Sequence, residues 1–199
     1  MKYLIIFAFL PVVAAFDYFL FSQTWAPTFC KINPQKCSKS PIENFIIHGL
    51  WPQFNNNTYP QFCEPCKKFD RDLLEKKMGQ DLALYWSDTG IVDWDFLEHE
   101  WEKHGCCSGY QMEEYFSNVL NLRKEWEYKR VFESIGIYPN TTVFLEKMRN
   151  VARDFCGNRC YIAFECLHNK LMAMYMSLSK NMSEIMRKIP DSCGEQFFW

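Results

Sequence analysis

The chain has 199 residues, of which 48% are hydrophobic and 18% aromatic, and 22 basic against 24 acidic side chains give a formal net charge of -2. This charge excludes a polycation that binds nucleic acid through bulk release of counterions. The length, without repeats or Pro-, Gly- or Ser-rich linkers, predicts one domain with a sizeable core.

The first 15 residues have the pattern of a secretory signal peptide. A single early lysine precedes an apolar run over residues 3–13, and the small residues Ala14 and Ala15 follow. The run is too short to favour a membrane span. We therefore expect residues 1–15 to be a signal peptide and residues 16–199 to form the domain, with no membrane contact in the mature protein.

The next segments carry strand and helix patterns. Aromatic residues predict a strand over 16–25 that Pro27 ends, and a second strand over 45–48 that Gly49 and Pro52 close. Apolar spacing and end signals then predict helices over 70–86, 93–104, 110–135 (one or two) and 142–155, and strands over 171–178 and 196–199. Because the helices cluster, we expect an α+β fold with a central, largely antiparallel sheet packed with several helices.

All ten cysteines lie after the predicted signal peptide. An even count in an oxidising compartment predicts a disulfide framework that stabilises the domain. The Cys63-Glu64-Pro65-Cys66 stretch is also compatible with a redox pair or half of a zinc site. The sequence has no second Cys-x-x-Cys motif and no pair of histidines at zinc-finger spacing, so we expect disulfides and no metal.

Three stretches, at Asn56, Asn140 and Asn181, match the acceptor pattern for N-glycosylation. The pattern arises often by chance, and it suits a secreted surface. We expect these three asparagines to carry glycans.

Three of the four histidines lie in two short segments, residues 47–52 and 99–104. Two imidazoles on separate elements, with a lysine and a carboxylate beside one of them, suffice to move protons around a phosphate ester. The sequence therefore favours acid–base chemistry at a phosphate. The candidate groups are His48, His99, Glu100, Lys103 and His104.

A helix over residues 93–104 would bring four of these groups to one side. At 100° per residue and relative to Glu100, His99 lies at about -100°, Lys103 at about -60° and His104 at about +40°. The same string lacks the His-Glu-x-x-His spacing of zinc metalloproteases, because its fifth position is Lys103. The pattern therefore argues against a metalloprotease.

His48 is a catalytic candidate only because of its neighbours, since a lone histidine near an aromatic strand is more often a hydrogen-bonded core residue. Gly49 allows close approach of the backbone, and Trp51 offers a face on which a base can stack. His168, the fourth histidine, has no carboxylate or lysine beside it and is interpreted as structural.

Residues 45–52 (FIIHGLWP) and 96–105 (FLEHEWEKHG) resemble the two active-site segments of the ribonuclease T2 family, in the family's usual order. Residues 16–30 and 58–63 are similar to the secreted S-like ribonucleases of that family. The match is strong through Gly109 and faint afterwards. The resemblance implies metal-independent and cofactor-independent cleavage of single-stranded RNA by transphosphorylation, through a 2′,3′-cyclic phosphate.

The resemblance also implies a role for each candidate group. His104 would be the general base that takes the 2′-hydroxyl proton, and His48 the general acid that protonates the departing 5′-oxygen. Lys103 and Glu100 would stabilise the phosphorane, and His99 would help to hold the phosphate. Because one imidazole must be neutral and the other charged, we expect an acidic optimum.

For base binding, the resemblance implies Trp51 and Tyr59 as stacking faces and Gln53 at the base edge. Many family members carry an acidic residue or asparagine at the Gln53 position, so base preference stays open. Stacking tolerates any base, since every base has a π-face. We expect broad specificity, a single-stranded RNA partner and a monomer.

Cysteine placement in the family implies three disulfides, Cys30 with Cys37, Cys63 with Cys107, and Cys166 with Cys193. A further C-terminal bridge common in the family looks absent, because Ser177 stands near one expected cysteine. Pairing Cys66 with Cys106 and Cys156 with Cys160 would use up the remaining cysteines, although sequence cannot fix their connectivity.

Two functions are therefore kept for this chain. The first is an acid endoribonuclease, secreted or in a lysosome-like acidic compartment. The second is a secreted binding or signalling protein on a ribonuclease fold, in which Cys106 and the divergent C-terminal half serve recognition. The presence of all five catalytic positions favours the enzyme, since a pure binding protein has no chemical need for them.

Overall fold

The computed structural model describes residues 15–37, 40–157, 161–182 and 189–199, so nearly all of the predicted signal peptide lies outside the described residues. Strands and helices follow in mixed order, which confirms the α+β prediction. The strands are β1 (Tyr18–Trp25), β2 (Phe45–Gln53), β3 (Thr142–Phe144), β4 (Tyr161–Leu167), β5 (Lys170–Leu178) and β6 (Gln196–Phe198). The helices are α1 (Ala26–Ile32), α2 (Arg71–Tyr85), α3 (Trp94–Lys103), α4 (Met112–Glu125), α5 (Tyr128–Ser134) and α6 (Leu145–Cys156), with 3-10 turns η1 (Pro34–Lys36) and η2 (Gly105–Cys107).

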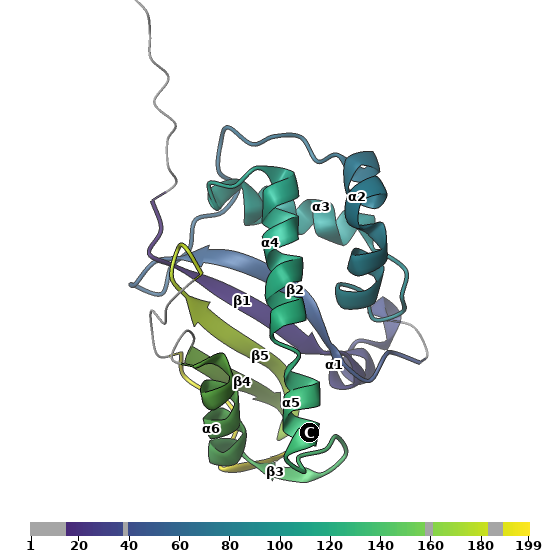
Figure 1. The fold of residues 1–199 in the computed structure, drawn as a ribbon, viewed down its shortest axis with the longest axis vertical. Coiled ribbons are helices and arrows are strands. Elements are labelled where there is room, and N and C mark those ends of the chain that lie inside the picture. The colour runs from purple at the N-terminus through teal and green to yellow at the C-terminus, as the bar shows by residue number, and fades with distance from the viewer. Residues whose placement is uncertain (1–14, 38–39, 158–160, 183–188) are drawn as a thin grey trace, which may run out of the picture.

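The strands form one sheet in the order β2-β1-β5-β6-β3, and β4 also pairs with β5. The pairs are antiparallel except for a parallel contact between β5 and β6 at Lys170 and Phe198, so the largely antiparallel prediction is confirmed. Helices α4 and α5 run across one face of this sheet (Figure 1). Among the described residues, no helix has both the length and the apolar content needed to cross a membrane.

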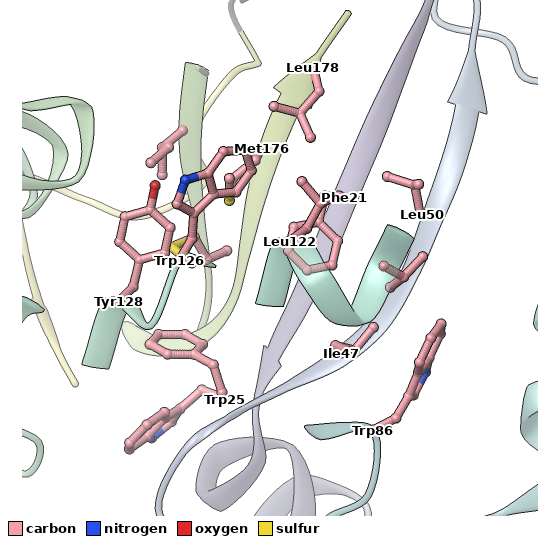
Figure 2. Packing of buried hydrophobic residues seen from close by; sticks show 14 of the residues in the cluster. Phe21, Trp25, Ile47, Leu50, Trp86, Leu122, Trp126, Tyr128, Met176 and Leu178 are labelled. Carbon is pink, nitrogen blue, oxygen red and sulfur yellow. The ribbon is translucent and has the colours of Figure 1, made fainter. Parts of the chain in front are cut away.

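The two faces of the sheet differ in what covers them. Phe21 and Met176 point into the core, where Leu122 of α4 packs over them (Figure 2). Side chains alternate along a strand, so the residues between these point to the other face. Pairing across β2, β1 and β5 sets Trp51 opposite Leu20 and Ser22 opposite Tyr175, so these four residues share a face. We call the face with Leu20, Ser22, Trp51 and Tyr175 the outer face.

Strand β2 ends later than predicted, whereas β1 ends where the sequence predicted. The prediction that Gly49 and Pro52 close the second strand is wrong, because β2 continues through both to Gln53. Strand β2 lies at the sheet edge, where a proline can sit without removing a ladder hydrogen bond. The first strand does end before Pro27, but Pro27 occupies the first turn of α1, a helix that we did not predict.

The C-terminal half also departs from the prediction. The expected helix over 142–155 begins only at Leu145, because residues 142–144 form strand β3 and pair with β6. Strand β4 was not predicted, although it pairs with β5 along its whole length. Local sequence preference gives way here to pairing with distant strands.

Disulfides tie several loops to this framework. The described residues include bonds between Cys30 and Cys37, Cys63 and Cys107, Cys66 and Cys106, and Cys166 and Cys193. The first, second and fourth are the pairs implied by the resemblance, and the third is one of the two pairs left open. Cys156 is also disulfide-bonded, while Cys160 lies outside the described residues.

Candidate active site

His48 is the extra residue of a β-bulge in β2. Ser22 of β1 pairs with Gly49, and the next residue of β1 pairs with Ile47, so His48 is skipped in the ladder. Such bulges re-aim a side chain next to active sites. The Trp86 indole donates a hydrogen bond of 3.1 Å to the His48 carbonyl oxygen and fixes the bulge from behind. The His48 side chain is 39% exposed and therefore reachable by a ligand.

Helix α3 supplies the second segment of the site. The Asp93 side chain accepts a hydrogen bond from the Phe96 backbone N–H and caps the first turn, which is why the helix begins here. The helix ends at Lys103, one residue earlier than predicted, and His104 is its C-cap. His104 still donates its backbone N–H to the Glu100 carbonyl at 3.1 Å, so it keeps the expected neighbour.

The candidate groups of α3 differ in burial. Glu100 and His104 are 3% and 5% exposed, Lys103 is half-buried, and His99 is exposed. Glu100 and His104 are therefore both buried, and each contacts Trp51, Glu100 through a hydrogen bond and His104 through a ring contact. Lys103 and His99 lie nearer the rim.

Glu100 joins the two segments. Its Oε1 lies 3.9 Å from His48 Nε2, and its Oε2 accepts a 2.7 Å hydrogen bond from the Trp51 indole N–H. A side chain at position 49 would overlap both the Glu100 carboxylate and the Trp51 indole. Gly49 thus permits the close approach expected from the sequence.

Burial shifts the titration of three groups. It raises the pKa of Glu100 to about 7, against the opposing effects of the Trp51 hydrogen bond and Lys103. Burial, together with the positive charges of Lys103 and His99, lowers the pKa of His48 to about 4. The same causes, with His48 added, lower the pKa of His104 to about 3. Both imidazoles are therefore neutral at pH 7.

His104 is surrounded by rings. Its imidazole lies 5.3 Å from the Trp51 ring and 5.8 Å from the Tyr59 ring, centroid to centroid. Its Nδ1 is buried and has no hydrogen-bond partner among the described residues. A buried polar atom without a partner calls for an explanation.

The predicted base-binding residues lie at different depths. Tyr59 is 45% exposed, Trp51 is half-buried, and Gln53 is only 9% exposed. Trp51 and Tyr59 both contact the His104 ring. Gln53 lies two residues past Trp51 on β2, so its side chain points to the same outer face.

A hollow of about 270 Å³ opens beside His48, and sequence reasoning missed most of its walls. Trp86, Ile91 and Phe96 line it, and the Phe96 ring lies 5.5 Å from the His48 ring. Trp86 comes from the end of α2 and Ile91 from the loop that follows. Nothing in their local sequence separates them from core residues, since the hollow exists only after α2 and α3 pack beside β2.

One cluster of possible metal ligands occurs among the described residues, formed by Cys30, Cys37 and Asp88. Both thiols are consumed in the Cys30–Cys37 disulfide, so the cluster offers no thiolate. Cys37 and Asp88 also line the hollow beside His48.

Comparison with known proteins agrees with this geometry. The sequence profile of the ribonuclease T2 family matches residues 16–193. Ribonuclease 1 of Arabidopsis thaliana is 37% identical over 154 residues, which cover 71% of this chain and 65% of that protein. The chain thus spans just under two thirds of that relative. Ribonuclease DdI of Dictyostelium discoideum is 30% identical over 90% of this chain and 80% of that protein.

The fold is also known from solved structures. RNase MC1 from bitter gourd seeds has a TM-score of 0.78 at 25% identity, over 92% of this chain and all of that chain. A variant of the same protein in complex with 5′-GMP has a TM-score of 0.79 at 25% identity, with the same coverage. A family profile that matches most of the sequence, a shared fold and the meeting of His48, Glu100 and His104 lead to one conclusion: this chain belongs to the ribonuclease T2 family.

Proposed function

We propose that the protein is a metal-independent endoribonuclease that cleaves single-stranded RNA by transphosphorylation. The observation that carries the proposal is the placement of two neutral imidazoles around one buried carboxyl group. His48 lies 3.9 Å from the Glu100 carboxyl group, and His104 packs against the Trp51 ring, whose indole N–H is hydrogen-bonded to the same carboxyl group. An acid and a base on two elements, with a polar group between them, is the arrangement that in-line transfer at a phosphate needs.

In the proposed reaction, His104 accepts the proton of the 2′-hydroxyl, and the 2′-oxygen attacks phosphorus. The bond from phosphorus to the 5′-oxygen breaks, and His48 protonates that oxygen. The products are a 2′,3′-cyclic phosphate and a free 5′-hydroxyl. Lys103 and Glu100 stabilise the phosphorane, and His99 at the rim helps to hold the phosphate.

The lowered pKa values support this division of roles. His104, with a pKa of about 3, stays neutral and basic over most of the acidic range. The protonated fraction of His48, with a pKa of about 4, grows as the pH falls. A bound phosphate is an anion and raises the pKa of a nearby imidazole, which favours the charged acid. We infer an acidic optimum.

The rings around the site indicate how RNA lies in it. Trp51 and Tyr59, beside the proposed base His104, take the base of the nucleotide whose 2′-hydroxyl attacks, with Gln53 toward its edge. The hollow beside the proposed acid His48 takes the leaving nucleotide. Because stacking supplies most of the contact, we infer broad base specificity.

We also make proposals for the oligomeric state, the location and the processing of the protein. We infer a monomer that is secreted or held in an acidic compartment, with residues 1–15 removed. Asn56, Asn140 and Asn181 are all exposed, as glycan attachment requires. A binding or signalling role on the same fold is the second candidate. It would be favoured if a His48→Ala variant kept the biological effect without cleavage.

The proposal is tested by incubating the oxidised mature protein with a single-stranded oligoribonucleotide at about pH 5, where imidazoles of ordinary pKa are protonated, with a chelator present. Mass analysis of the ends should show cyclic phosphates, and His48→Ala or His104→Ala should abolish them. His168→Ala is the matched control, because His168 lies exposed at the β4–β5 turn. Absence of cleavage by folded protein would leave the binding role as the better account.

A further inference from the structure

A second hollow adjoins the site and has Trp51 as one of its walls. It has a volume of about 320 Å³ and lies over the outer face of the sheet. Its walls come from β1, β2, β4, β5 and the segment after β5, which are far apart in sequence. Its lining residues include Leu20, Trp51, Glu165, Tyr175 and Pro190.

One wall of this hollow carries a polar pair. The Tyr175 hydroxyl donates a hydrogen bond to Glu165 Oε2. Burial and the Glu165 carboxylate raise the pKa of Tyr175, so the hydroxyl remains a donor. Among the described residues, no lysine, arginine or histidine forms an ion pair with Glu165. The carboxylate therefore keeps the capacity to accept a further hydrogen bond from a ligand N–H.

The chemistry of this wall suits a nucleobase better than a phosphate. Trp51, Tyr175, Leu20 and Pro190 offer apolar and aromatic surface, on which a base can stack. A carboxylate accepts hydrogen bonds from the exocyclic amino groups of bases. It also repels a phosphate, and so the contact with RNA here is through the base.

The proposed roles of the two histidines determine which end of the RNA strand lies on which side of the site. His48 protonates the departing 5′-oxygen, so the strand on the 3′ side of the cut lies toward His48 and the hollow of Trp86 and Phe96. The nucleotide on the 5′ side lies at His104 and Trp51. The second hollow shares Trp51 as a wall, so a strand continuing in the 5′ direction reaches it next.

We propose that this hollow binds the base of the nucleotide immediately 5′ to the one held at Trp51, with Tyr175 as a stacking face and Glu165 as the acceptor for its amino group. This inference rests on the proposed function, which sets the direction of the strand. It makes Glu165 a specificity-determining residue that favours adenine, guanine or cytosine over uracil at that position.

The test uses one scissile dinucleotide and three trinucleotides made from it by adding adenosine, uridine or an abasic nucleotide at the 5′ end. For the unmodified enzyme, kcat/KM should be about fivefold to tenfold higher with adenosine than with the abasic unit, which is the gain expected from a stacked base. Uridine should fall between them. Glu165→Gln should bring adenosine and uridine close together, and Tyr175→Leu should bring all three trinucleotides to within about twofold, since the stacking face is lost.

Glu114→Gln is the matched control. It removes the same charge from the exposed surface of α4, on the opposite side of the sheet, and should keep the full preference for adenosine. If the unmodified enzyme cuts the dinucleotide but ignores the added base, the inference is wrong and the ribonuclease function stands. The same holds if the preference survives in both hollow variants. If neither the dinucleotide nor longer RNA is cut, the proposed function itself fails.

Discussion

Glu100 shows how burial can set the chemistry of a single side chain. The carboxyl group sits between His48 and the Trp51 indole, and burial raises its pKa to about 7. At the acidic pH inferred for the enzyme, it is therefore mostly protonated. A protonated carboxyl can donate a hydrogen bond to a phosphate oxygen, whereas an ionised one would repel it.

Replacement of Glu100 by glutamine tests this protonation. Two groups, Glu100 and His48, must hold protons, so log kcat/KM should fall above pH 7 with a slope approaching about -2. Glu100→Gln should reduce that slope to about -1 and lower kcat by about a hundredfold, the usual loss when one stabilising group is removed. The pH profile of kcat/KM measures the slope, and saturating substrate measures kcat. Glu102→Gln, exposed on the same helix, should change neither, and an unchanged slope in Glu100→Gln would contradict the assignment.

Gly49 is a second residue with a strict requirement. Gly49→Ala would drive a methyl group into the Glu100 carboxylate and the Trp51 indole, so we expect a loss of about 1–3 kcal/mol in stability and a marked loss of kcat/KM. Urea unfolding and initial rates measure the two. Gly79→Ala in α2 meets only Glu75 Cγ at 3.6 Å and should cost neither. Full activity in Gly49→Ala would show that the site does not need this close packing.

At the scale of the elements, two disulfides join the same two loops. Cys63 binds Cys107 and Cys66 binds Cys106, so η2 is held twice just after His104. Each bond alone would close a loop of about 40 residues in the unfolded chain. With one in place, the second closes only a short ring, and loop entropy grows with length.

We therefore expect the Cys66→Ser/Cys106→Ser double variant to lose less than about 2 kcal/mol, below the usual cost of removing a disulfide. Removal of all four cysteines of the two bridges should cost more than twice as much, because the large loop then opens. Denaturant unfolding under oxidising conditions measures the difference. Equal losses from the double and quadruple variants would mean that the two bridges do not share one loop.

The elements also show which parts of this fold a sequence can predict. Long, strongly patterned segments such as α2, α3, β1 and β5 fall close to the predicted ranges. Strand β4 was missed because its apolar run, Tyr161 to Phe164, is short and Glu165 interrupts it. Strand β3 is three residues long and owes its conformation to pairing with β6, at the far end of the chain.

The same distinction holds for the site. His48, Glu100 and His104 lie in two contiguous motifs, and local sequence therefore indicated them. The two hollows are made by Trp86, Glu165 and Tyr175, which come together only when the sheet and helices assemble. No local pattern marks these residues, because each one reads as an ordinary core or strand position until its neighbours are known.

For the whole molecule, the titrating groups of the site make stability depend on pH. The pKa of His104 is lower in the folded protein than its ordinary value of 6.5, so the stability it contributes is lost as the pH falls from about 6.5 toward 3. The pKa of Glu100 is raised from 4.5, so its contribution is present below pH 4.5 and lost as the pH rises toward 7. His48, whose pKa is lowered from 6.5 to about 4, acts in the same direction as His104, so the two histidines oppose Glu100 between pH 4.5 and 6.5.

His104→Asn should remove one side of this balance. We expect the change in the free energy of unfolding between pH 6.5 and pH 4.5 to shift by about 2 kcal/mol towards greater stability at pH 4.5, because the His104 effect is gone while those of His48 and Glu100 remain. Glu100→Gln should shift the same difference in the opposite direction. Urea unfolding at both pH values measures each variant. Shifts of the same sign in the two variants would rule out the assigned titrations.

The position of Trp51 couples two binding events, the stacking of a base and the protonation of Glu100. Its indole N–H donates a hydrogen bond to the Glu100 carboxyl group, and its ring is the stacking face that we propose for a base. A base stacked on the ring restrains the indole and so alters the environment in which Glu100 titrates. Linkage between two binding events is reciprocal, so a proton on Glu100 changes base affinity by the same factor by which the base changes proton affinity. In the proposed site, a base bound on the Trp51 ring would therefore change the protonation of Glu100 through this one side chain.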